Sequence, residues 1–125
     1  MYIYFKNVEE LKACCPMESG IWNKEILQGY MIYSCVRGFK QYIDEFMAGY
    51  RSDDRLAELL FDFLLNEDYD GSDCQIGAAI YISRMDRELL RRKKELLLRA
   101  QKNEVYWKRP FQNKAPLDWL DYAPF

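Results

Sequence analysis

The chain has 125 residues, half of them hydrophobic, and a formal net charge of −2. This length predicts one domain with one hydrophobic core, which we place over residues 1–125. The sequence contains no histidine, which excludes Ser-His-Asp and Cys-His catalysis and removes the commonest zinc ligand. We therefore expect a protein that is not an enzyme and that uses no cofactor.

The cysteines and the apolar segments bear on the compartment of the protein. Four cysteines stand at positions 14, 15, 35 and 74, without a CxxC pair. The opening residues MYIYFKNVEE lack the basic segment and the long apolar run of a secretory signal. No stretch approaches the roughly 18 uncharged apolar residues of a membrane span. We expect reduced thiols in a cytoplasmic chain that does not contact a membrane.

Helical patterns begin close to the N-terminus. Residues 1–5, MYIYF, allow an edge strand. Asn7 and Glu10 then have the spacing of a capping box, in which two side chains satisfy free N–H groups at a helix start. This predicts a short first helix that Pro16 and Gly20 bring to an end.

Residues 22–50 carry two helical stripes, and Gly38 marks a break between them. The second stripe has apolar residues at helical spacing from Phe39 to Tyr50. Ser52 is the predicted N-cap of a third helix. The apolar face of that helix consists of Leu56, Leu59, Leu60, Phe63 and Leu64.

The segment 66–71, NEDYDG, resembles the start of a calcium-binding loop. Asp68, Asp70 and Gly71 occupy positions 3, 5 and 6 of the loop template. Position 12, which supplies the bidentate glutamate, is Gly77. Because this strongest ligand is missing, we expect no metal site.

The second half of the chain is also predicted to be helical. Ser72 and Gln75 form a second capping-box pattern ahead of an apolar helix with small residues, and a strand over 78–83 is the alternative. Asp86 starts a long predicted helix over 87–107, with Leu89, Leu96, Ala100 and Trp107 facing inward. The aromatic, proline-containing segment 110–125 is expected to pack on the helices. The fold class is therefore all-α, a bundle of about five or six helices.

Charge is divided between two segments. Residues 53–73 hold eight acids and one base, a local charge of −7. Within them, Asp54, Glu58 and Asp62 lie at i, i+4 and i+8 on one helix face. Local capping chemistry explains Ser72 and Asp73 but gives no structural role to the other acids, which are Glu58, Asp62, Glu67, Asp68 and Asp70. This surface is either solvated, or paired internally with the basic segment, or built to bind a positive partner, with Tyr69 as an aromatic anchor. We name as the acidic surface Asp54, Glu58, Asp62, Glu67, Asp68, Tyr69 and Asp70.

Residues 84–109 are basic, with ten bases and four acids, a local charge of +6. The run Arg91, Arg92, Lys93 and Lys94 allows a nucleic-acid interface through phosphate contacts. The neighbouring acids and the sequence pI of about 5.2 favour a solvated face or an internal partner for the acidic segment.

Two stretches resemble segments of a known class of proteins. LLNEDYDGSDCQIGAAIYI and NEVYWKRPF are similar to small helical immunity proteins of bacterial contact-dependent growth inhibition and related toxin systems. The resemblance implies a cytoplasmic, non-catalytic protein that binds the C-terminal domain of a cognate toxin, often a nuclease. The alternatives are another protein-binding inhibitor or adaptor, for example phage-encoded, and a nucleic-acid binder.

Overall fold

The computed structural model describes residues 4–69 and 72–101. They form seven α-helices, a short 3-10 helix and a two-stranded sheet, which confirms the all-α fold. In chain order the elements are α1 (Val8–Ala13), β1 (Met17–Glu18), β2 (Ile21–Trp22), α2 (Lys24–Tyr33), α3 (Lys40–Ala48), α4 (Asp54–Leu65), η1 (Glu67–Tyr69), α5 (Asp73–Ile82), α6 (Arg87–Arg92) and α7 (Lys94–Gln101).

Helix α1 begins at the predicted cap, Asn7, but the capping box is formed in one direction only, because Glu10 reaches back to Lys6 rather than to Asn7. The Asn7 side chain accepts a hydrogen bond from the Glu10 N–H at 3.0 Å, and the Glu10 carboxylate accepts one from the Lys6 N–H at 3.4 Å. Tyr4 and Phe5 lie in no strand, so the edge strand is wrong for them, and residues 1–3 lie outside the described part. The strands are instead β1 and β2, which form an antiparallel hairpin across the positive-φ turn of residues 19–20.

Helices α2 and α3 are separated where the sequence predicts a break. Gly38 has a φ of +94°, a left-handed conformation that glycine adopts without strain. The two helices pack through aromatic rings, with Tyr30 and Phe46 at 5.4 Å between centroids. Trp22 and Tyr50 extend this cluster at 5.0 Å, so aromatic burial fixes this half of the core.

Helix α4 is largely buried, and its N-cap is Asp53 rather than the predicted Ser52. The Asp53 carboxylate accepts hydrogen bonds from the Leu56 N–H at 2.9 Å and from the Trp22 Nε1–H at 3.2 Å. A carboxylate is favoured at this position because the N-terminal end of the helix dipole is positive. Ser52 donates instead to Asp86 at 3.2 Å.

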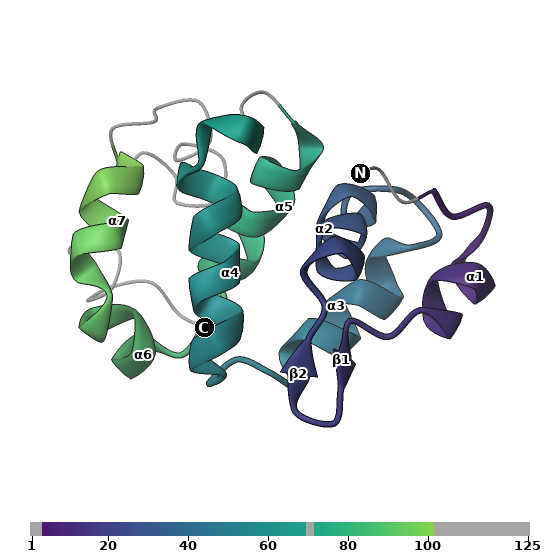
Figure 1. The fold of residues 1–125 in the computed structure, drawn as a ribbon, viewed down its shortest axis with the longest axis horizontal. Coiled ribbons are helices and arrows are strands. Elements are labelled where there is room, and N and C mark those ends of the chain that lie inside the picture. Colours follow the sequence, from purple (N-terminus) through teal and green to yellow (C-terminus); the bar gives the residue numbers. More distant parts are fainter. Residues whose placement is uncertain (1–3, 70–71, 102–125) are drawn as a thin grey trace.

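Helix α5 packs between α2 and α4 (Figure 1). The strand alternative for 78–83 is wrong, because the segment is helical through Ile82. Ser72 holds the N-cap position without a capping bond and donates to the Tyr69 carbonyl at 2.6 Å. Gln75 is fully buried and donates to the Leu64 carbonyl at 3.2 Å, so it satisfies the C-terminal end of α4 from the neighbouring helix.

The predicted long helix over 87–107 is divided into α6 and α7. The helix stops at Lys93, whose φ and ψ of −113° and 26° are not helical. Of the predicted inward residues, Leu89 and Ala100 are buried and Leu96 is half-buried. Trp107 and the segment 110–125 lie outside the described residues. Across residues 4–69 and 72–101, every helix is too short or too polar to span a bilayer.

Candidate functional site: the acidic surface and two adjoining hollows

The acidic surface runs along the exposed side of α4 and continues into η1. Asp54 and Glu58 are exposed, and Asp62 is half-buried near the end of α4. Glu67 and Asp68 follow in η1. The fold therefore places these five acids on consecutive elements, as the sequence predicts. Asp70, the remaining acid of the predicted surface, lies outside the described residues.

The three acids of α4 have partners within the molecule. Asp54 lies 3.2 Å from the Lys93 ammonium, and Glu58 lies 3.0 Å from the Arg55 guanidinium. Asp62 pairs with Lys24. The expectation that Glu58 and Asp62 lack a structural role is therefore wrong. The Asp54–Lys93 pair also joins the acidic and basic segments, as the internal-partner interpretation predicts.

Lys24 is the residue of this surface that sequence reasoning missed. It lies 38 residues from Asp62, so no local spacing links the two. The hydrogen bond to the Asp62 carboxylate, against the opposing effect of burial, raises the pKa of Lys24. The ammonium also stands 5.7 Å from the Phe63 ring centroid and 5.8 Å from that of Tyr69. Lys24 thus binds a carboxylate and two aromatic faces together.

The Tyr69 ring packs partly against the core of the protein itself. Its ring meets Phe63 edge-to-face at 5.2 Å between centroids, and the residue is half-buried. Its role as an aromatic anchor for a partner stays a prediction.

Glu67 and Asp68, which we call the acidic end, are the uncompensated part of the surface. Both are exposed, and within residues 4–69 and 72–101 neither carboxylate has an ion pair or hydrogen bond. They follow the C-terminus of α4, whose last turn has no basic residue. Because the C-terminal end of a helix dipole is negative, two more negative charges there destabilise the fold.

A hollow of about 340 Å³ lies beside the acidic end, between α4 and α7. Phe61, Leu65 and Leu96 give it apolar walls. Its polar lining consists of Asp62, Asn66 and Arg99. We call it the α4–α7 hollow. Half of its lining residues are polar, so the hollow has a mixed rather than an apolar lining.

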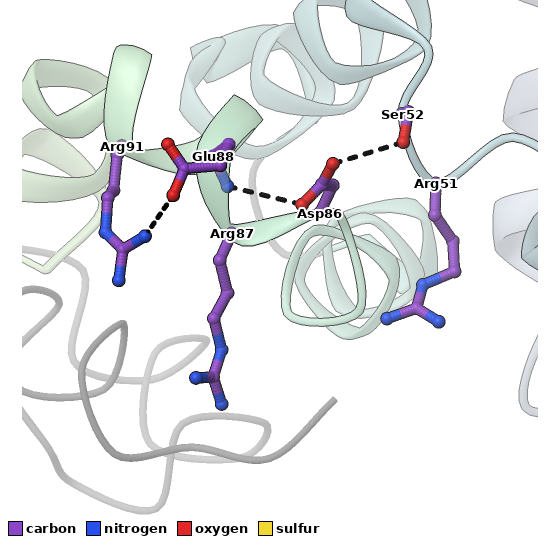
Figure 2. A pocket seen from close by; sticks show the side chains of 6 residues that line it. All are labelled: Arg51, Ser52, Asp86, Arg87, Glu88 and Arg91. Carbon is purple, nitrogen blue, oxygen red and sulfur yellow. Dashed lines mark hydrogen bonds and ion pairs between the residues drawn. The ribbon is translucent and has the colours of Figure 1, made fainter.

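A second hollow, of about 570 Å³, lies where the α3–α4 connection meets the start of α6 (Figure 2). One backbone and one side-chain hydrogen bond join the α3–α4 and α5–α6 connections: the Asp86 N–H donates to the Arg51 carbonyl at 2.9 Å, and Arg51 Nε donates to the Arg84 carbonyl at 2.8 Å. The lining consists of Arg51, Ser52, Asp86, Arg87, Glu88 and Arg91. Arg51, Ser52 and Asp86 hold the two connections together, which is a structural role.

Ion pairs within the chain engage two of the four residues of the basic run 91–94. Arg91 pairs with Glu88 at 2.5 Å, and the Lys93 side chain is only 13% exposed in its pair with Asp54. Arg92 and Lys94 are exposed. With two of its four cations engaged internally, the run offers less to phosphates than the sequence suggests, which weakens the nucleic-acid alternative.

Metal-ligating and nucleophilic side chains were the remaining candidates for a site among the described residues. No group of three or more cysteine, aspartate or glutamate side chains among them is placed to hold a metal ion. Burial raises the pKa of the Cys74 thiol to about 12, so this thiol stays protonated and unreactive at neutral pH.

Comparisons with protein-family models, with curated proteins and with solved structures find no match to this chain.

Proposed function

We propose that the chain is a non-catalytic protein-binding domain that neutralises a cognate bacterial toxin, in the manner of a cytoplasmic immunity protein of contact-dependent growth inhibition. The acidic end is the observation that carries the proposal. Glu67 and Asp68 repel the C-terminal dipole of α4, which costs about 0.3–1 kcal/mol each at low ionic strength. They make no contact among the described residues that offsets this cost.

A positive partner accounts for this uncompensated charge. Nuclease toxins bind polyanions in basic clefts, and exposed carboxylates on a stable helical body occupy such a cleft in place of phosphates. Complementary charge also raises the rate of encounter, by up to about 10³-fold in strongly steered pairs. Fast association suits a protein that must block an enzyme already delivered into the cell.

The second candidate is another protein-binding inhibitor or adaptor, for example a phage-encoded one. It uses the same acidic end, so the fold supports it equally, and only the identity of the partner separates the two. A nucleic-acid binder is third, because Arg91 and Lys93 are engaged with acids of the same chain.

Co-expression with the product of the adjacent gene tests the proposal. We expect a complex of defined stoichiometry and loss of the partner's nuclease activity when the chain is added in equimolar amount. A nuclease that stays fully active in the complex contradicts neutralisation and favours the adaptor function. A chain that forms no complex with its neighbour's product contradicts the immunity function itself.

A further inference from the structure

A cation site is built where the start of α2 meets the end of α4. The Lys24 ammonium pairs with the Asp62 carboxylate and lies 5.7 Å from the Phe63 ring centroid and 5.8 Å from that of Tyr69. The two rings meet edge-to-face at 5.2 Å between centroids, so they form adjoining walls of one site. A carboxylate beside two aromatic rings attracts a cation both by its charge and by the ring quadrupoles. We call Asp62, Phe63 and Tyr69 the cation cage.

Lys24 occupies the cage but is only weakly fixed in it. It is the first residue of α2, where the positive end of the helix dipole disfavours a cation. Its side chain is 43% exposed and that of Asp62 is 41% exposed. An ion pair at such exposure shifts an equilibrium by no more than about fivefold. The flexible four-carbon stem allows the ammonium to turn into water, so another cation can displace it.

The cage suits an arginine better than it suits Lys24. Lys24 contacts Oδ2 of Asp62, while Oδ1 has no hydrogen bond within residues 4–69 and 72–101. A guanidinium donates to both oxygens of a carboxylate at once and stacks on aromatic rings. Because Phe63 is buried, an arginine from outside reaches its ring only after Lys24 has left. The two cations therefore compete for one site.

The cage is continuous with the acidic end. Tyr69 is the last residue of η1, and Glu67 and Asp68 are the other two. We propose that the cation cage receives an arginine side chain of a partner protein in exchange for Lys24, while neighbouring basic residues of the same segment pair with the acidic end. The inference rests on the proposed function in requiring a protein partner with a basic surface. It adds the side chain that is bound and makes Lys24 a competitor within the chain.

Two short peptides test the cage without the partner protein. The probes are the blocked tripeptides Arg-Lys-Lys and citrulline-Lys-Lys, titrated into the full-length ¹⁵N-labelled chain. Citrulline has nearly the shape of arginine but carries no charge. We expect the arginine peptide to shift the amides of residue 24 and of residues 62–69. It should bind about threefold or more tightly than the citrulline peptide, as the loss of an exposed ion pair and cation–π contact predicts.

Lys24→Ala removes the competitor and should strengthen binding of the arginine peptide about two- to fivefold, with a smaller gain for the citrulline peptide. Lys24→Gln, which keeps most of the stem, gives a second measurement of the same effect. The control is Lys40→Ala, which removes the same charge from the exposed pair with Asp44 and should leave both affinities unchanged. Adding Asp62→Asn to Lys24→Ala should bring the two peptides to nearly equal affinity.

Equal binding of the two peptides to the Lys24→Ala protein would overturn the inference. An arginine-peptide affinity that neither Lys24 variant raises would also overturn it, because the contact of Lys24 with Asp62 would then be a structural ion pair only. Arginine-selective binding without inhibition of a nuclease encoded by the adjacent gene supports the cage and contradicts the immunity function. Inhibition that Asp62→Asn and Tyr69→Leu leave unchanged supports the function and contradicts the cage.

Discussion

Gly77→Ala is expected to lower the free energy of unfolding by about 1–3 kcal/mol, the usual cost of overpacking a core. An ideal Cβ at position 77 would lie 2.4 Å from the Met31 carbonyl oxygen and 2.6 Å from Ser34 Oγ. The first of these is backbone of α2, which cannot move without shifting the helix. The better helix propensity of alanine, worth about 1 kcal/mol, is too small to reverse the sign. Chemical denaturation measures the difference.

Gly49→Ala is the matched control, because it makes the same chemical change in an uncrowded position. Its Cβ would meet no atom closer than 3.5 Å, and its φ of −75° suits any residue. We expect it to be neutral or stabilising by up to about 1 kcal/mol. A Gly77→Ala protein as stable as Gly49→Ala would mean that α2 and α5 are not in close contact.

Asp44→Ala is expected to cost about 2–4 kcal/mol, since it leaves a buried donor unsatisfied and removes charged hydrogen bonds. The Asp44 carboxylate accepts hydrogen bonds from Tyr81 at 2.6 Å, Lys40 at 2.8 Å and Arg84 at 2.9 Å. Tyr81 is only 3% exposed, so its hydroxyl cannot turn to bulk water without cost. The network joins α3 to the end of α5. Glu45→Ala, an exposed change on the same helix, should stay within about 0.5 kcal/mol of wild type.

The same carboxylate gives stability a pH dependence. Burial tends to raise the pKa of Asp44, but the hydrogen bonds from Lys40 and Tyr81 and the charge of Arg84 outweigh it and lower the pKa below 3.8. A depressed pKa in the folded state stabilises the protein above the ordinary carboxyl pKa, and this contribution is lost as pH falls through the folded value. Wild type should therefore lose its advantage over Asp44→Asn below about pH 4. A stability difference that is constant between pH 7 and pH 3 would contradict this account.

Features with local signals were predictable from the sequence. The Asn7 cap, the break at Gly38 and the buried helix around Gly77 each depend on residues within one or two helical turns. Where two local signals stand side by side, the sequence does not decide between them. Ser52 and Asp53 are both good caps, and the contact of Ser52 with Asp86 assigns the cap to its neighbour.

The pairing of the acidic surface was not predictable, because its partners are distant in sequence. Lys24 reaches Asp62 across 38 residues. Lys93 reaches Asp54 because the Lys93 backbone is not helical, which divides the long predicted helix into α6 and α7. Spacing along one helix shows which acids share a face, whereas packing between helices determines which of them are neutralised. Among the described acids of the surface, that packing leaves Glu67 and Asp68 uncompensated.

The most direct test of the central claim is the affinity of the protein encoded by the adjacent gene for the double variant Glu67→Lys, Asp68→Lys at two salt concentrations. The control is Glu18→Lys, Glu45→Lys, which makes the same charge change at exposed positions on β1 and α3. We expect the first variant to be about 0.6–2 kcal/mol more stable than wild type at low ionic strength. It should associate more slowly, bind more weakly and lose much of the salt dependence, while the control keeps wild-type affinity at both salt concentrations. Wild-type affinity of the Glu67→Lys, Asp68→Lys protein at both salt concentrations would contradict a partner bound through the acidic end.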